Sequence, residues 1–489
     1  MAQEIRGPRN CEVEARDRSN LSTIIRRNLT LIIKKILHSE HYIPAETNIF
    51  SPWVSWEDFV LCIIQKHTEM NKFNYRFIFA GILFLAMLTS ASTSEDNNTE
   101  GSQNITMIQA RGTQLVDQNG NTLFLRGTNL GNWLVPEGYM FKMGQVNSPR
   151  LIDELLHELV GPDSLKKFWA DYLNNYITHQ DIKYLKKIGC NHIRLPFHYK
   201  LFTEEEYMGG KNSGFKYFDR IVNWCREEQL YILLDMHCAP GGQTGDNIDD
   251  SYGYPWLMKS QSSQDLLCEI WVRIAQKYKD EPVILGYDIM NEPIAHYFED
   301  ELDELNPALF QIYKRVVKEI RDVDPNHLIF LNGSIWSTNF DVFEELLGEN
   351  IVYEFHKYWV DVKQEAVREY VDFRAKHQVP VYIGETGENT DEWVQEFREL
   401  LEKNEIGWCF WPYKKMNNTR GIMNFNQPET YFVISDYAKS DRSSYKNIRE
   451  NRPDTERVQK ALNEFTEQCL YKNCFQNMGY ILALGFNPE

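Results

Sequence analysis

Two glutamates follow apolar segments that have the composition of buried β-strands. Glu292 comes directly after GYDIMN, and Glu385 comes directly after VPVYIG. If both segments are parallel strands of one sheet or barrel, the two carboxyl groups enter the same cleft. One carboxyl group can then be protonated and act as an acid, while the other is ionised and attacks or activates water. Hydrolysis of a glycosidic bond requires such a pair of facing carboxylates.

Other polar or aromatic side chains also stand where an apolar segment ends. Each has a structural alternative: an acid can cap a helix, an arginine can form a structural ion pair, and a histidine or tryptophan can belong to the core. Their shared placement favours one site over separate structural roles, whereas Cys238 reads as a small buried hydrophobe. The residues at segment ends are Arg194, His237, Asn291, Glu292, His356, Tyr358, Glu385 and Trp411.

Short apolar segments alternate with amphipathic ones from about residue 106 onward. The amphipathic segments, such as KYFDRIVNWCREE, repeat apolar residues every three or four positions, which is typical of one helix face. Eight strands alternating with helices predict a (β/α)₈ TIM barrel, whose chemistry lies where strands end. A doubly wound sheet is the alternative, but no Gly-rich phosphate loop follows the first strand. The expected strands are 123–127, 192–197, 231–236, 284–290, 327–332, 351–355, 379–384 and 407–411.

An N-terminal β-hairpin is expected before the first barrel strand. The sequence GTQLVDQNGNTLFLRG has Asn119-Gly120 where a type I′ turn would connect two strands.

These residues resemble glycoside hydrolase family 5, the cellulase-like retaining β-glycosidases, over about residues 106–430. The resemblance rests on Arg194-Leu-Pro-Phe197, Leu234-Asp-Met-His237, Asn291-Glu-Pro293, His356-Lys-Tyr358, Gly384-Glu385 and Trp411. It implies Glu292 as the acid/base and Glu385 as the nucleophile. It further implies that Asn291 binds the 2-hydroxyl, that Arg194 and Tyr358 keep Glu385 ionised, and that the histidines orient the carboxylates and the sugar. Trp411 would stack on the sugar ring.

A narrower resemblance points to the exo-β-1,3-glucanase branch. It rests on Gly127-Thr-Asn-Leu-Gly-Asn-Trp133 and on Val135-Pro-Glu-Gly-Tyr-Met140, and it implies that Glu137 and Tyr139 bind the non-reducing sugar. The aromatic that the branch carries before Asp246-Asn247 is missing here, although Trp359 stands near the position of a second one. We therefore expect release of glucose from β-1,3-glucan, with an endo-β-1,4-glucanase or a mannan-cleaving enzyme as the alternative. A glycan-binding barrel without catalysis is the distant third.

Composition excludes several other classes of protein. The chain has 489 residues, 52 Lys+Arg against 70 Asp+Glu, and a formal net charge of -18, which disfavours nucleic acid and anionic membranes as partners. With 43% hydrophobic residues it can build a large core. Because no HxH pair ends the first strand and no zinc-like CxxC pair exists, we expect neither a metal nor another cofactor. β-Glucan or an oligosaccharide is the expected partner, and a monomer is favoured.

The N-terminal region has the pattern of a secretory leader. Residues 70–92 combine a basic start, an apolar run too short for the roughly 20 residues that span a bilayer, and small residues at the end. We expect residues 1–69 to be absent from the mature protein, 93–105 to be a polar linker, and 106–489 to be the catalytic domain. The protein would then be extracellular or periplasmic, or a type II membrane protein if 1–69 are retained. Cys469 and Cys474 are the best candidates for a local disulfide.

Overall fold

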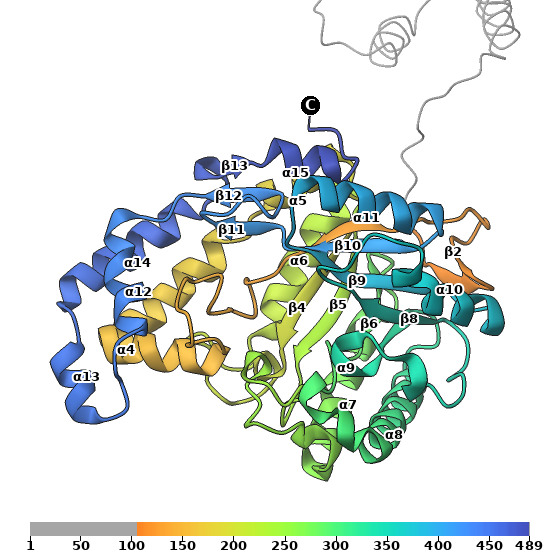
Figure 1. The fold of residues 1–489 in the computed structure, drawn as a ribbon, viewed down its shortest axis with the longest axis horizontal. Helices are drawn as coiled ribbons and strands as arrows, with labels where there is room; N and C mark the ends of the chain where they lie inside the picture. The colour runs from red at the N-terminus through yellow and green to blue at the C-terminus, as the bar shows by residue number, and fades with distance from the viewer. Residues whose placement is uncertain (1–104, 489) are drawn as a thin grey trace, which may run out of the picture. The chain divides into compact units, whose positions relative to one another are not determined.

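Residues 105–488 are described by the structure, which is a computed structural model (Figure 1). The predicted leader at 70–92 and the segment 1–69 lie outside the described residues, as does the linker 93–105 except for its last residue. None of the helices in the described part is long and apolar enough to cross a membrane.

Eight parallel strands close into a barrel in the order β10-β3-β4-β5-β6-β7-β8-β9, which confirms the predicted (β/α)₈ fold (Figure 1). The first strand begins later than expected, because Leu123 N donates to Leu115 O and this part of the chain pairs with the N-terminal hairpin. The barrel strands are β3 (Arg126–Asn129), β4 (His192–His198), β5 (Tyr231–Cys238), β6 (Ile284–Asp288), β7 (Leu328–Asn332), β8 (Ile351–His356), β9 (Val381–Gly387) and β10 (Gly407–Trp411).

Amphipathic helices connect the barrel strands. Side-chain caps begin several of them: Ser148 Oγ accepts from Leu151 N at the start of α4, and Thr390 does the same for α11. Gly161 and Pro162 kink α4. The helices between strands are α4 (Pro149–Asn175), α5 (His179–Ile188), α6 (Gly214–Glu228), α7 (Gln261–Tyr278), α8 (Leu302–Arg321), α9 (Ser334–Ser337), α10 (Glu365–His377) and α11 (Asp391–Lys403).

The predicted hairpin turn at Asn119-Gly120 is present, since Val116 and Thr122 form an antiparallel bridge on either side of it, but the turn is not of type I′. Another turn precedes it. Strands β1 (Gln109–Arg111) and β2 (Gln114–Val116) pair around Gly112-Thr113. Asn119-Gly120 lies in the next turn, where the Asp117 carboxylate accepts from Asn119 N and Asn121 N. Of the pair only Gly120 has a positive φ, whereas a type I′ turn needs two such residues. The apolar side chains of this region, among them Ile108 and Leu115, pack on apolar side chains near the amino ends of the barrel strands.

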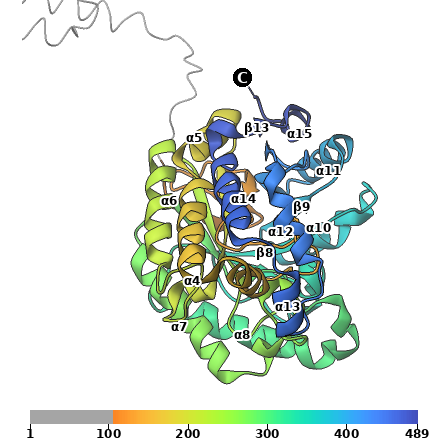
Figure 2. The ribbon, with the colours of Figure 1, turned by 90° about the vertical axis from the view of Figure 1, so that its left-hand side faces the viewer.

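The chain after β10 adds a small sheet and four helices to one side of the barrel. Helix α14 packs against α4 (Figure 2). The ring of Phe465 stacks on that of Tyr172, with centroids 6.0 Å apart. These elements are β11 (Lys414–Met416), β12 (Met423–Phe425), β13 (Phe475–Gln476), α12 (Phe432–Ala438), α13 (Tyr445–Asn451), α14 (Thr455–Gln468) and α15 (Met478–Ala483).

The expected disulfide between Cys469 and Cys474 is absent, because both thiols are free. Cys469 ends α14 and its Sγ contacts Thr466 O, while Cys474 Sγ contacts Leu470 O at 3.3 Å. The two thiols thus face carbonyl groups at the helix end instead of each other. Cys238 is buried, as expected.

Candidate active site

The residues singled out from the sequence converge at the carboxyl ends of the barrel strands. Arg194 lies in β4, His237 in β5, His356 at the end of β8, Glu385 in β9 and Trp411 at the end of β10. Asn291 and Glu292 follow β6, and Tyr358 follows β8. Because all eight strands run in parallel, their carboxyl ends meet at one mouth of the barrel.

Glu292 and Glu385 face each other at this mouth. One carboxylate oxygen of each, together with a ring nitrogen of His356, lies within 4.8 Å of the others. Retaining glycosidases hold their two carboxyl groups about 5–5.5 Å apart, whereas inverting enzymes leave about 6.5–9.5 Å for a water molecule. The observed spacing therefore fits retention.

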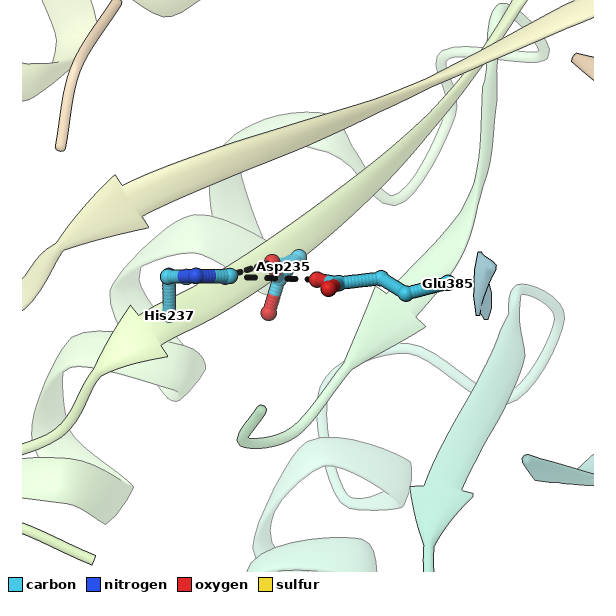
Figure 3. Close-up of side chains that lie close together, drawn as sticks. All are labelled: Asp235, His237 and Glu385. Carbon is cyan, nitrogen blue, oxygen red and sulfur yellow. Dashed lines mark hydrogen bonds and ion pairs between the residues drawn. The ribbon is translucent and has the colours of Figure 1, made fainter. Parts of the chain in front are cut away.

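Glu385 has the surroundings of an ionised carboxylate. Arg194 Nη1 lies 2.6 Å from its Oε1, and the Tyr358 hydroxyl donates to its Oε2 at 3.1 Å. Figure 3 shows Glu385 and His237 pointing toward each other; His237 Nδ1 lies 3.8 Å from Glu385 Oε1 and 2.8 Å from Asp235 Oδ2. Burial raises the pKa of Glu385, and the positive charge of Arg194 opposes this shift.

Among residues 105–488, no lysine or arginine contacts the Glu292 carboxyl group directly. Its close polar partner within this range is His356, whose Nδ1 lies 2.8 Å from Oε1. Burial raises the pKa of Glu292 to about 7. Its backbone has φ 45°, in the left-handed region that a non-glycine residue rarely adopts. A carboxyl group in this state holds its proton near neutral pH.

Arg194 is the centre of a buried charge cluster that the sequence analysis only partly anticipated. Besides Glu385, the guanidinium contacts three acids in the barrel interior, and it donates to the side-chain oxygens of Asn129 and Asn291. Burial raises the pKa of Asp235 and of Asp288 to about 7, and that of Glu354 well above its usual value. The only signal in the sequence was an acid inside each of three apolar strands. The three acids are Asp235 at 3.1 Å, Asp288 at 2.7 Å and Glu354 at 3.5 Å.

Aromatic rings form one wall of the site. The ring of His237 stacks on Trp411, with centroids 5.5 Å apart and planes at 7°. Trp411 Nε1 donates to the Tyr139 hydroxyl at 2.8 Å, so the loop after β3 reaches the end of β10. The ammonium group of Lys415 lies 4.8 Å from the centroid of the Tyr139 ring and pairs with Glu388.

Glu137 lies beside this wall with an unused polar atom. Its Oε1 is buried and has no hydrogen-bond partner. Burial raises the pKa of Glu137 well above its usual value, and the neighbouring charges of Glu385 and Glu388 add to the shift. A buried oxygen without a partner is costly, so this position suits a ligand hydroxyl.

The family model of cellulase, glycosyl hydrolase family 5, matches residues 158–417. The chain belongs to glycosyl hydrolase family 5. A β-xylosidase of Phanerodontia chrysosporium is 29% identical over 365 residues, which cover 67% of this chain and 74% of that protein. Endoglucanase C of Acetivibrio thermocellus is 24% identical over 313 residues, 51% of this chain and 88% of that protein.

A third relative has a name that specifies a linkage. The probable glucan 1,3-β-glucosidase A of Aspergillus fumigatus is 28% identical over 250 residues, 50% of this chain and 56% of that protein. Among solved structures, that of AoRut has a TM-score of 0.50 at 20% identity, covering 60% of this chain and 89% of that chain, which supports the fold alone.

As a member of family 5, the chain is an O-glycosyl hydrolase of the retaining type. This class uses two carboxyl groups. The relatives include both 1,3-glucosidases and endoglucanases, so the family membership itself does not select a linkage.

The family 5 site also brings together two sets of side chains that could coordinate a cation. Asp235, His237 and Glu385 form one set, and Glu292 and His356 form the other with the same Glu385. The Arg194 guanidinium already lies 2.6–3.1 Å from oxygens of Glu385 and Asp235. That guanidinium therefore already supplies a positive charge beside the two acids of the first set.

Proposed function

We propose that Glu385 is the nucleophile and Glu292 the acid/base of a retaining β-glucosidase. The observation that carries this assignment is the asymmetry of the two carboxyl groups. Arg194 and Tyr358 contact Glu385 directly, whereas in the described part of the chain Glu292 has the imidazole of His356 as its polar contact. Two carboxylates this close repel each other, so one of them holds a proton. The guanidinium beside Glu385 stabilises the charge of that carboxylate, which supports Glu292 as the protonated group.

The same asymmetry accounts for both half-reactions. Glu385 attacks the anomeric carbon while Glu292 protonates the leaving oxygen, which gives a glycosyl ester on Glu385 and an ionised Glu292. Water then attacks the ester, Glu292 removes its proton, and Glu385 leaves as a carboxylate. Asn291 is placed to bind the 2-hydroxyl, because its Oδ1 is held by Arg194 and its Nδ2 faces the site beside His237. Trp411 offers the stacking surface for the sugar ring.

Chemical rescue tests the two roles. We expect Glu385→Ala to lose most activity and to regain it with azide as the inverted glycosyl azide. Glu292→Ala with azide should give the glycosyl azide of retained configuration, because the covalent intermediate still forms. The native enzyme should release the sugar with retained configuration. Release of the inverted sugar would refute the assignment.

We further propose that the enzyme removes single glucose units from the non-reducing end of β-1,3-glucan. Glu137 supports this, since its unpartnered oxygen suits a 4- or 6-hydroxyl of a terminal sugar, whereas an internal β-1,4-linked residue has no free 4-hydroxyl. Tyr139 supports it too, because its hydroxyl accepts a hydrogen bond from Trp411 Nε1 in the aromatic wall of the same site. The name of the Aspergillus fumigatus relative agrees with the linkage.

An endo-β-1,4-glucanase is the second candidate, favoured by the relative named endoglucanase C. Early digests of laminarin separate the two activities: glucose alone supports exo action, whereas a ladder of oligosaccharides or rapid loss of viscosity of a soluble cellulose derivative supports endo action. Aryl β-glucosides and β-xylosides compared at the same time test the activity that the Phanerodontia relative is named for.

Glu137→Leu provides the structural test of exo action, because leucine can neither donate nor accept a hydrogen bond. The change should lower kcat/KM on laminarin by about ten- to a hundredfold, which corresponds to the roughly 1–3 kcal/mol of a lost buried hydrogen bond. Glu344→Leu is the matched control, because Glu344 is exposed. An unchanged rate for Glu137→Leu would remove this residue from the sugar site.

We also propose that the protein is exported, on the basis of the leader pattern at residues 70–92. N-terminal sequencing of secreted material should begin within residues 91–96. A chain retained intact from Met1 would refute the proposal.

A further inference from the structure

His356 connects two carboxyl groups. Its Nδ1 lies 2.8 Å from Glu292 Oε1, and its Nε2 lies 3.2 Å from Glu354 Oε1. The ring and Glu354 are both buried. Glu354 lies in the barrel interior beside Arg194, two residues before His356 on β8.

The imidazole has one proton to share between these two contacts. Burial lowers the pKa of His356 to about 3, so the ring is neutral at physiological pH. A neutral imidazole has one nitrogen that donates and one that accepts. If Nδ1 donates to Glu292, then Nε2 accepts, and Glu354 must be the donor. If Nε2 donates, Nδ1 accepts from Glu292 and captures the proton that the reaction needs.

The surroundings of Glu354 favour its neutral form. Its Oε2 is buried and has no hydrogen-bond partner, which is far more costly for an ionised carboxylate than for a neutral acid. Burial, and next the negative charge of Asp288, raise the pKa of Glu354 well above its usual value, whereas Arg194 opposes the shift. The titratable groups that interact with Glu354 are Arg194, Asp235, Asp288, Tyr313, His356, Tyr382, Glu385 and Cys409.

From this geometry we propose that Glu354 is a positioning residue: as a neutral carboxylic acid it donates to Nε2 of His356 and so keeps the Nδ1–H directed at Glu292. The proposal rests on the role of Glu292 as acid/base. One oxygen of Glu292 then accepts from His356 in both half-reactions. The other oxygen remains free to carry the catalytic proton to the leaving group and to receive a proton from water.

The chain makes room for this contact with a glycine. A Cβ at position 384 would lie 1.5 Å from Glu354 Oε1 and 3.1 Å from His356 Nε2. No side chain fits there without moving the carboxyl group away from the imidazole. Gly384 directly precedes Glu385, so the site residue and the space for Glu354 come from the same strand.

Two substitutions separate a hydrogen-bond donor from a structural filler. Glu354→Gln keeps a neutral donor of the same shape, and Glu354→Leu removes the donor. Glu344→Gln and Glu344→Leu at an exposed site are the matched controls. The tautomer of His356 is read from the ¹⁵N shifts of the histidine ring without substrate, and kcat and KM are measured on a β-glucoside across pH.

We expect native enzyme and Glu354→Gln to carry the proton on Nδ1 and to have similar kcat. Glu354→Leu should show a mixed tautomer and a kcat that is about 10- to 100-fold lower, as for other lost supporting contacts, with KM little changed. The infrared band of a protonated carboxylic acid should be present in the native enzyme, absent in Glu354→Gln, and therefore visible in the spectrum of native enzyme minus variant.

Three results would overturn the proposal: a proton on Nε2 in the native enzyme, an unchanged tautomer in Glu354→Leu, or an equal loss of kcat in both variants. If Glu354→Leu does not fold, the tautomer of His356 in the native enzyme and the comparison of kcat between native enzyme and Glu354→Gln still test the proposal. Failure of the azide experiment would refute the role of Glu292 and leave the tautomer measurement unaffected, so the two failures are distinguishable.

Discussion

Replacing Arg194 by methionine removes the only positive charge that contacts the buried carboxyl groups of the described barrel interior. The side chain of Arg194 is fully buried, and its guanidinium contacts Glu385, Asp235 and Asp288 at 2.6–3.1 Å. Breaking a buried ion pair by removing one partner costs about 3–5 kcal/mol, because an uncompensated charge stays behind. We therefore expect the free energy of unfolding of Arg194→Met to be lower by about 3–5 kcal/mol at pH 7.

The loss should become smaller as the pH falls. In folded Arg194→Met the acids that lost the guanidinium bind about one more proton than the same acids in the folded native protein. The unfolded variant and the unfolded native protein bind the same number of protons. The folded pKa of these acids is thus raised, and stability is lost as pH rises toward that pKa. One extra proton corresponds to about 1.4 kcal/mol per pH unit. Between pH 7 and pH 5 the deficit should shrink by about 2–3 kcal/mol.

Urea unfolding at pH 5, 6 and 7 measures this dependence, and kcat on a β-glucoside measures the effect on Glu385. A nucleophile that keeps its proton cannot attack, so kcat should fall roughly 10²–10³-fold, as for other lost charge-stabilising donors. Arg315→Met is the matched control, because this partly exposed arginine pairs with Asp265 and Glu319. Exposed pairs contribute about 0–1 kcal/mol. A deficit in Arg194→Met that is the same at all three pH values would refute the reasoning.

Three further predictions follow from the same geometry. Gly384→Ala should lower the free energy of unfolding by about 1–3 kcal/mol and reduce kcat, because its Cβ would lie 1.5 Å from Glu354 Oε1. The control is Gly210→Ala, where the nearest atom to the added Cβ is 3.4 Å away; it should change neither the free energy of unfolding nor kcat, measured by urea unfolding and the same assay. The value of kcat/KM should fall above about pH 7, since burial raises the pKa of Glu292 to about 7 and the acid must be protonated. A kcat/KM that is still the same two pH units above this pKa would contradict the prediction. Cys474→Ser should change the free energy of unfolding by less than about 1 kcal/mol in urea without reductant, because its thiol is free; a loss of about 2–5 kcal/mol would indicate a disulfide.

The strand ends could be predicted because hydrophobic patterning is local. The apolar segments before Glu292 and Glu385 are buried strands or their direct continuations, and parallel strands bring their carboxyl ends together regardless of the details of packing. The same argument placed Arg194, His237 and His356 at the site. The position of the hairpin turn at Asn119-Gly120 was predicted correctly, but its type was not, because the Asp117 side chain stabilises a turn in which Asn119 does not have a positive φ.

The acids around Arg194 could not be assigned in the same way. Asp235, Asp288 and Glu354 lie within apolar strands, and strands buried on both faces do not alternate between polar and apolar residues. The pattern therefore does not tell whether such an acid points into the barrel or toward the helices. A one-residue change in register would reverse that direction.

By itself, the sequence determined which residues reach the mouth of the barrel, since strand order and strand ends follow from patterns along the chain. Only the tertiary structure decided which charges and hydrogen-bond partners surround each residue there. Glu292 and Glu385 are the same amino acid after similar segments, yet one contacts a guanidinium and the other an imidazole. That difference arises from residues between 64 and 191 positions away in the chain. Charge interactions and burial depend on distances in space, so the chemical roles of two identical side chains diverge only once the barrel has closed.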